Sequence, residues 1–367
     1  MAITWPAKNN YATGDVLTAT NMNGIGDDLN ALFDNSFYAG KNKIINGDFG
    51  INQRNFTSTT TSSTYGFDRW RYVYTDGTVT YSAQTFTAGS APVTGYEGTN
   101  FARLVTTGQT LASARAFLNQ RIESVRTFAN QTVTISFWAK AASGTPSIAV
   151  AASQIFGTGG SATVTTPFNK VTISTSWTRY SITGTIPSIS GKTIAGGDDN
   201  LSMAIWVSAG SDNATEASSI GIQSNTFDIW GVQLESGSTA TPFQTATGTK
   251  QGELAACQRY YWRAVSGGSY GLLGISGYVV NSTTANINVN YPVFMRTIPT
   301  SVDYSTLTIQ DSAASLYAVS AASINTDITN NYAAGLNITI SGATSGRWAR
   351  MLANNSTNAY IGFSAEL

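Results

Sequence analysis

The sequence predicts a mainly β protein, with a large antiparallel β-sandwich, a smaller C-terminal β-sandwich, a short N-terminal helical leader and a short linking helix. Apolar and polar residues alternate along many short segments, as they do in half-buried strands. Helical spacing is confined to the leader and to one segment between the two β-regions. Only 11% of the residues are charged, and the 35 glycines, with many Ser, Thr and Asn residues, suit strands joined by turns.

The first element is the leader, residues 1–40, which contains the segment "TATNMNGIGDDLNALFDN". Its apolar residues are three or four positions apart and form one helical stripe: Met22, Ile25, Leu29 and Leu32. Two glycines within the stripe weaken such a helix, so we expect it to need a partner, either sister copies or a docking surface. The alternative is a surface helix folded onto its own domain.

The second element, residues 41–246, is predicted to be one antiparallel β-sandwich. The segment "TVTISFWAK" places four apolar residues on one face: Val133, Ile135, Phe137 and Ala139. The segment "LSMAIWVSA" repeats this alternation. In "FDIWGVQLE" the phase of the alternation changes at Trp230–Gly231, which predicts a β-bulge. Because no helical segments separate these strands, they are expected to pair antiparallel.

The third element, residues 247–263, is predicted to be a linking helix. In "GELAACQRYYWR" three residues share a helical stripe: Leu254, Cys257 and Tyr261. Residues 264–367 form the last element, a smaller β-domain. Its final segment "AYIGFSAEL" alternates to the last residue, so we expect the C-terminus to be held in a sheet.

The sequence offers little for catalysis. Cys257 is the only cysteine and the chain has no histidine, so neither a histidine-activated thiolate, a Ser-His-Asp triad nor a histidine-based zinc site can form. We therefore interpret Cys257 as a buried apolar residue of a structural joint. No phosphate-binding loop motif is present. Paired carboxylates, as in glycosidases, keep a hydrolase as an alternative, but the prediction is a protein that is not an enzyme.

The charge pattern also limits the partners. The net charge is +0 and no basic run occurs, which disfavours nucleic-acid binding. No stretch approaches the ~20 apolar residues of a membrane span, so no membrane insertion is expected. The N-terminus has no apolar secretory segment, and a single cysteine cannot form an internal disulfide.

Several blocks resemble one family. "NKIINGDFGINQR" (42–54) and "FDIWGVQLESGSTATPF" (227–243) resemble the opening and closing strands of galactose-binding-like jelly rolls of the carbohydrate-binding-module type. Between them, "YGFDRWR", "TSWTRYSITGTIPSI" and "LSMAIWVSAGSD" resemble the jelly roll of tailed-bacteriophage and prophage tail fibre or tail spike proteins. The leader and the segments "ELAACQRYYWR" and "YPVFMRTIPTSV" are similar to the flanks of the same proteins, so the resemblance covers nearly the whole chain.

This resemblance implies a homotrimeric tail fibre that binds carbohydrate on the host cell surface. It further implies a virion location after assembly in the host cytoplasm, attachment to other tail or capsid proteins through the N-terminus, and a C-terminal domain at the tip. The alternatives are a head fibre or capsid decoration protein without a receptor role, and a hydrolase of surface polysaccharide.

Related jelly rolls often hold a structural calcium near the first and last strands. The acidic residue that commonly follows the Phe of the opening motif is Gly50 here, which departs from that pattern. Asp48 and Asp228 remain the candidate ligands, since calcium is bound by several oxygens. The alternative is that both are polar residues of turns and strand edges.

Sugar binding commonly uses exposed aromatic faces beside hydrogen-bonding groups. Three tryptophans fall opposite the apolar stripes of their strands and could line a platform: Trp138, Trp206 and Trp230. The alternative is that they pack against a neighbouring subunit or the C-terminal domain. Trp70 with Arg71 could join this surface, or Trp70 could lie in the core. In the C-terminal domain the candidates are Tyr270, Tyr278 and Trp348.

Overall fold

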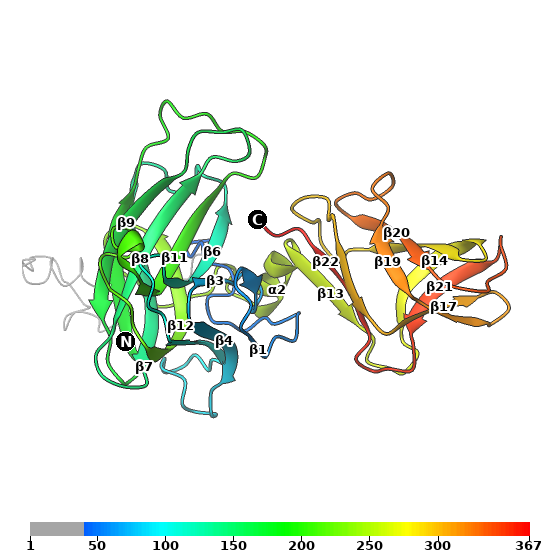
Figure 1. Ribbon diagram of the computed structural model, residues 1–367, viewed down its shortest axis with the longest axis horizontal. Coiled ribbons are helices and arrows are strands. Elements are labelled where there is room, and N and C mark those ends of the chain that lie inside the picture. The colour runs from blue at the N-terminus through cyan, green and yellow to red at the C-terminus, as the bar shows by residue number, and fades with distance from the viewer. Residues whose placement is uncertain (1–39) are drawn as a thin grey trace, which may run out of the picture.

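The computed structural model describes residues 40–367, and these form two β-domains joined by one short helix (Figure 1). The predicted stripe in the leader, Met22, Ile25, Leu29 and Leu32, lies outside the described residues. The two domains lie one after the other along the longest axis of the molecule (Figure 1). The predicted fold class, mainly β with antiparallel sheets in sandwiches, is confirmed.

The larger domain is a sandwich of two six-stranded sheets, and all strand pairs in it are antiparallel. The first sheet contains, in spatial order, β1 (Ser58–Thr59), β4 (Thr78–Thr85), β5 (Asn100–Thr107), β12 (Asn225–Ser236), β7 (Gln131–Ala141) and β10 (Thr178–Ile186). The second contains β2 (Thr64–Tyr65), β3 (Arg71–Thr75), β6 (Arg115–Glu123), β11 (Asn200–Ala209), β8 (Ser147–Ile155) and β9 (Val164–Thr172). A short 3-10 helix, η1 (Ser211–Asn213), follows β11.

The core of this domain fills the space between the two sheets. The predicted stripe of β7 is part of it, because Val133, Ile135 and Phe137 are fully buried. Leu118 of β6 and Ile205 of β11 are fully buried in the same core. Burial of such side chains contributes roughly 1.5–3 kcal/mol each relative to exposure, so the alternating strands specify this packing.

The predicted bulge in β12 is confirmed. The pairing of β12 with β7 changes register between Trp230 and Gln233. Gly231 lies within this irregularity at φ +63°, a backbone conformation that favours glycine. A Cβ atom there would lie 2.7 Å from the ring of Trp138, so a side chain would also collide with its neighbour.

The opening motif "NKIINGDFG" is held by its asparagine side chains. Asn42 Oδ1 accepts a 3.0 Å hydrogen bond from the Leu234 N–H, which ties the motif to β12. Asn46 is fully buried, and its amide donates to the carbonyls of Ile51 (2.8 Å) and Asp68 (3.0 Å). Because buried backbone groups need partners, these asparagines are explained by structure and not by ligand binding.

The linking helix is α2 (Lys250–Gln258), which is shorter than the predicted 247–263. Thr249 caps it by accepting a 3.0 Å hydrogen bond from the Gly252 N–H. The C-terminal limit was wrong because Tyr261 belongs to a strand of the next domain. Cys257 is fully buried, and burial raises the pKa of its thiol well above the usual value, which agrees with a structural role.

The smaller domain pairs a three-stranded sheet with a seven-stranded one. The three-stranded sheet contains β13 (Tyr261–Val265), β22 (Tyr360–Ser364) and β16 (Val302–Ser305). The other contains, in spatial order, β18 (Leu316–Ala318), β17 (Leu307–Asp311), β21 (Trp348–Ala353), β14 (Leu272–Asn281), β15 (Thr284–Asn290), β20 (Ala333–Thr339) and β19 (Ala321–Ile324). The inward residues of β22, Ile361 and Phe363, are fully buried, but the strand ends at Ser364 and does not run to the last residue as predicted.

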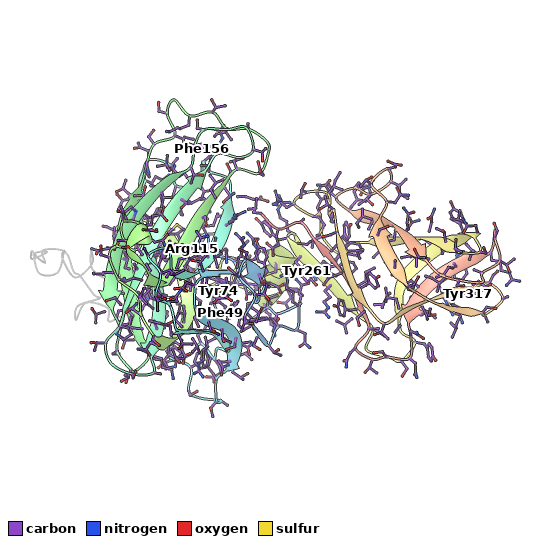
Figure 2. The ribbon with its side chains drawn as sticks, in the orientation of Figure 1. Phe49, Tyr74, Arg115, Phe156, Tyr261 and Tyr317 are labelled. Carbon is purple, nitrogen blue, oxygen red and sulfur yellow. The ribbon has the colours of Figure 1, made fainter. Side chains whose placement is uncertain are left out.

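The two domains are joined by polar contacts as well as by α2. Arg69 of the larger domain pairs with Glu366 near the C-terminus, and its guanidinium lies 3.4 Å from the ring centre of Tyr260. Gln53 donates a 2.6 Å hydrogen bond to the Tyr261 carbonyl, and Tyr261 lies between the two domains (Figure 2). Tyr65 donates to the Leu367 carbonyl (2.9 Å), so the last residues are held against the larger domain.

A buried carboxylate in the smaller domain gives a pH prediction. Burial by itself would raise the pKa of Asp311, but hydrogen bonds from Arg347, Ser315, Tyr317 and Ala313 lower it to about 2. Because the pKa in the folded state is below the usual 3.8, Asp311 stabilises the fold above about pH 4 and this contribution is lost as the pH falls toward 2.

We expect Asp311→Asn to lower the unfolding temperature of the smaller domain at pH 7 and to reduce its dependence on pH between 4 and 2. Thermal unfolding followed at several pH values measures both effects. Asp327→Asn, at an exposed position, is the matched control and should leave both unchanged. Equal pH profiles for the wild type and Asp311→Asn would contradict this assignment.

Candidate carbohydrate-binding site

Trp138 and Trp230 do not form an exposed platform, so this prediction was wrong. Their side chains lie on the side of the first sheet that faces away from the inter-sheet core, but only 9% and 0% of their surfaces are exposed. The rings of Tyr96 and Phe243 lie 5.7 Å and 5.1 Å from that of Trp230 and cover it. Gly98 approaches so closely that a Cβ there would lie 2.7 Å from Trp230 Nε1. Loops therefore bury this second face as well.

Trp70 belongs to the core, which was the alternative interpretation. It is 1% exposed, and its ring lies 5.1 Å from that of Phe49. Its indole donates a 2.8 Å hydrogen bond to the Asn46 carbonyl, so its polar atom is satisfied by the opening motif. Trp70 cannot contact a ligand at the surface.

Trp206 and Arg71 are brought together on the outer face of the second sheet. In the strand register, Trp206 of β11 pairs with Phe117 of β6, and Arg71 of β3 pairs with Asn119 of β6. Side chains of alternate residues share a face, so these four lie on one side, opposite the core residue Leu118. They line a hollow of about 280 Å³, close to the lower end of the ~300–1,000 Å³ common for ligand pockets.

Small side chains make the floor of this hollow. Ala204 and Ser202 of β11 pair with Ala151 and Ser153 of β8, and all four line the cavity. On the other face of β8, Ile148 and Val150 are fully buried in the core. The alternation in "SIAVAAS" therefore directs the larger side chains toward the core and leaves only alanine and serine on the outer face. A row of small residues across neighbouring strands leaves open space above the sheet.

Trp206 does not offer an exposed ring for stacking. It is 3% exposed, packs at 4.5 Å from the ring of Phe117, and clusters with small apolar residues that include Ala217 after η1. The prediction that Trp206 presents its ring on an exposed platform is therefore wrong. The N–H of its indole is buried and has no hydrogen-bond partner among residues 40–367.

Three other residues that line the hollow each have a buried polar atom without a partner among the described residues: Asn119 Oδ1, Arg115 Nε and Arg121 Nε. Asn119 is 4% exposed, and its amide nitrogen already donates to Ser202 at 2.9 Å. Since about 90% or more of buried polar groups have hydrogen-bond partners, four unpartnered atoms in residues that line one hollow are unusual, and they would gain partners only if water or a ligand reached them.

Arg115, Asn119 and Arg121 were missed as candidates at the level of the sequence. The signal was present, because in "RAFLNQRIE" (115–123) the residues Arg115, Phe117, Asn119 and Arg121 alternate with Ala116, Leu118 and Gln120 and so share one face. Arg115 lies on the larger domain (Figure 2).

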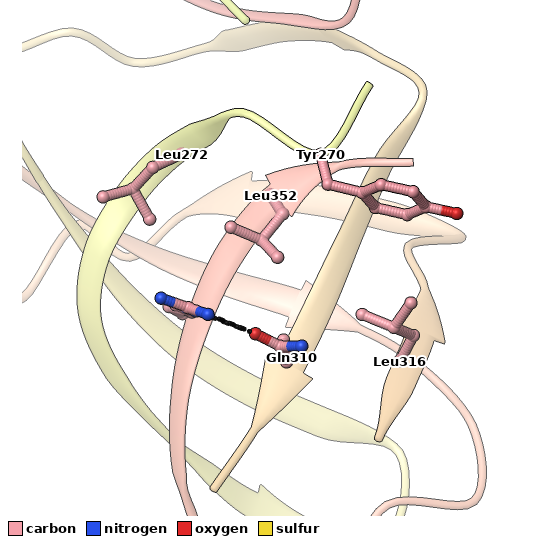
Figure 3. Close-up of a pocket in the computed structure, with 6 residues that line it drawn as sticks. Tyr270, Leu272, Gln310, Leu316 and Leu352 are labelled. Carbon is pink, nitrogen blue, oxygen red and sulfur yellow. Dashed lines mark hydrogen bonds between the residues drawn. The ribbon is translucent and has the colours of Figure 1, made fainter. Parts of the chain in front are cut away.

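The aromatic candidates of the smaller domain are exposed as predicted. Tyr278 of β14 and Trp348 of β21 are register partners on the outer face of the seven-stranded sheet, and 52% and 48% of their surfaces are exposed. Tyr270 is 50% exposed and lines a separate hollow of about 360 Å³ with Leu272, Leu316 and Leu352 (Figure 3).

The hollow beside Tyr270 differs from that of the larger domain in its polar groups. Its Arg350 donates two hydrogen bonds, of 2.9 Å and 2.6 Å, to Gln310 Oε1. Leu272 and Leu316 are 50% and 47% exposed. Arg350 and Gln310 thus satisfy each other while two leucines are exposed, which suits contact with an apolar surface better than binding of a hydrogen-bonded ligand.

The two predicted calcium ligands have other partners. Both oxygens of Asp228 accept hydrogen bonds from Arg103, at 2.6 Å and 2.8 Å, and Lys140 lies 3.6 Å away. Asp48 accepts a 2.7 Å hydrogen bond from the Tyr96 hydroxyl. Among residues 40–367 no group of three or more His, Cys, Asp or Glu side chains is placed to hold a metal ion. A structural calcium stays a prediction.

No helix in residues 40–367 combines the length and apolar character needed to cross a membrane. No protein-family model matches the sequence. No curated protein matches it either.

Solved structures resemble about half of the chain. A CBM4 structure has 17% identity and a TM-score of 0.30, covering 52% of this chain and 98% of that one. The CBM22-2 xylan-binding domain of Paenibacillus barcinonensis Xyn10C has 18% identity and a TM-score of 0.29, covering 46% and 92%. The enzymatically active domain of tailspike protein 4 of bacteriophage CBA120 has 14% identity and a TM-score of 0.31, covering 53% and 21%. At such scores these similarities do not identify a ligand for this chain.

Proposed function

We propose that the protein is a non-enzymatic carbohydrate-binding protein whose larger domain binds a glycan on the outer face of its second sheet. The observation that carries this proposal is the hollow over β3, β6, β11 and β8, with its floor of small residues and its lining of arginine, asparagine, serine and threonine residues. Sugars present many hydroxyl groups, and guanidinium, amide and hydroxyl side chains gathered around one hollow are suitable hydrogen-bonding partners for them.

We further propose that the protein serves as a homotrimeric bacteriophage tail fibre that attaches the virion to glycans of the host surface. The support is the resemblance of the sequence blocks over nearly the whole chain, together with two β-domains that follow one another along the molecule. In a trimer, three weak sites act together, and avidity can exceed a single affinity by ~10²–10⁴. A head fibre without a receptor role is the alternative.

Filling the hollow tests the glycan proposal. Ser153 lies on its floor, so Ser153→Trp should abolish binding in a glycan-array screen of the full chain while leaving the unfolding temperature within a few degrees of the wild type. Ser181→Trp introduces the same change at an exposed position of β10 in the other sheet and should bind normally. Unchanged binding by Ser153→Trp would place the glycan site elsewhere, with Tyr278 and Trp348 as the next candidates.

The fibre proposal is tested by mass and by location. We expect the full chain to have the solution mass of a trimer, and antibody-labelled virions to show the protein on the tail. A chain that begins at residue 42 tests the role of the leader. If the leader trimerises the protein, this shorter chain should be monomeric. If the leader only anchors the protein to the virion, the shorter chain should stay trimeric. Label on the capsid would favour the head-fibre alternative, and a monomeric full chain would exclude the trimeric fibre.

A further inference from the structure

We propose that the hollow on the second sheet selects acidic glycans, with Arg71, Arg115 and Arg121 binding the carboxylates of uronic-acid-type sugars. This inference rests on the proposed glycan-binding function and adds the chemical class of the ligand. All three arginines line the hollow. The one acidic residue that lines it, Glu216, is exposed and belongs to the segment after η1.

Eight of the 13 arginines in residues 40–367 form no ion pair with a described carboxylate, and three of these eight line the hollow. Five arginines form ion pairs within residues 40–367: Arg54, Arg69, Arg103, Arg259 and Arg347. Arg71, Arg115 and Arg121 form none with the described residues. The side chains of Arg115 and Arg121 donate no hydrogen bond there, and the Nε atom of each is buried without a partner.

The strand register places like charges close together. Arg71 is the register partner of Asn119, and Arg121 lies two residues further along β6 on the same face. Such diagonal neighbours have Cα atoms roughly 7–8 Å apart. Burial lowers the pKa of the Arg71 guanidinium, and the charges of Arg121 and Arg115 lower it further. Like charges gathered without a counter-charge destabilise one another, and a bound anion would remove that cost.

The chemistry of the hollow favours a carboxylated sugar over other anions. A guanidinium presents a planar fork of donors that matches a carboxylate in a bidentate arrangement. The same hollow is lined by neutral residues whose side chains suit hydrogen bonding to sugar hydroxyls: Asn119, Ser153, Thr165 and Ser202. A single-stranded nucleic acid would need exposed aromatic rings for its bases, and Trp206 is only 3% exposed.

The test measures the affinity of the full chain for polygalacturonate, alginate and hyaluronate, and for the carboxyl-reduced form of each polymer. We expect at least one carboxylated polymer to bind, its reduced form to bind at least tenfold more weakly, and the affinity to fall as salt is raised. Arg71→Gln and Arg121→Gln should each weaken binding about tenfold, the effect of losing a charge-assisted hydrogen bond. Arg126→Gln, at an exposed position outside the hollow, should bind as the wild type does.

Unfolding temperatures of all variants establish that they are folded. Binding of a neutral glycan that Ser153→Trp abolishes and both arginine variants retain would overturn the acidic specificity while leaving the glycan proposal intact. Failure of all three carboxylated polymers to bind at low salt would also overturn the specificity. Failure of neutral glycans as well would overturn the proposed function. Equal displacement of the bound polymer by a single-stranded oligodeoxynucleotide would show a general anion surface and contradict carboxylate recognition.

Discussion

Replacing Glu366 with alanine is expected to lower the free energy of unfolding by about 3–5 kcal/mol, because it leaves a buried charge without its partner. The Arg69 side chain is 1% exposed and that of Glu366 is 6% exposed. Burial by itself would lower the pKa of Arg69, but the Glu366 carboxylate and the nearby Tyr260 raise it above the usual value. The guanidinium therefore stays charged in the folded protein and depends on this carboxylate.

A second ion pair provides the matched control. Glu123 pairs with Arg259 at 3.1 Å, but the two side chains are 33% and 41% exposed. Exposed pairs of this kind contribute about 0–1 kcal/mol, so Glu123→Ala should change stability much less than Glu366→Ala. Urea unfolding of both variants, followed by tryptophan fluorescence, measures the difference. If both variants lose less than about 1 kcal/mol of unfolding free energy, the prediction fails, because the Arg69 guanidinium would then be stabilised by water or by another group when Glu366 is absent.

The position of this pair has a consequence for the whole molecule. Glu366 lies next to the last residue, and Arg69 lies two residues before Arg71, the first residue of the strand β3. The Glu366 side chain also pairs with Arg54, which is linked to Asp68 at 3.0 Å. The tail of the smaller domain thus completes a buried charge network in the larger domain. We expect Glu366→Ala to loosen the junction between the domains as well as to destabilise the larger one.

The strands could be predicted from the sequence because their signal is local. Alternation placed Val133, Ile135 and Phe137 in the core, and the change of phase at Trp230–Gly231 located the bulge. Alternation also separates two faces of a strand, but it does not say whether loops cover the second face. That limit explains why Trp138 and Trp230 were assigned to an exposed platform.

The site and the junction depend on contacts between distant parts of the chain. Arg71 and Arg121 are brought together by the pairing of β3 with β6, and Trp206 joins them through the pairing of β6 with β11. The Arg69–Glu366 pair joins residues 297 positions apart. A pattern within one strand cannot reveal such neighbours, although the alternation within β6 could have shown that its arginines share a face.

Trp230→Ala separates a core role from a ligand-binding role, and we expect it to lower the free energy of unfolding by about 3–5 kcal/mol. Trp230 is fully buried, and its ring lies within 6 Å of those of Phe86, Tyr96, Trp138 and Phe243. Removing the indole would leave a large cavity between the first sheet and the loops that cover it. These loops hold their positions through this ring, so we expect them to loosen before the sheets separate.

Trp348→Ala is the matched control, because Trp348 is 48% exposed on the smaller domain and its loss should cost less than about 1 kcal/mol. Both variants should retain glycan binding in the hollow at temperatures where they are folded, since neither residue lines it. Calorimetry and binding measured on the same samples distinguish the two roles. Loss of binding in Trp230→Ala with an unchanged unfolding temperature would mean that the covering loops open and that the tryptophan platform exists in the ligand-bound state.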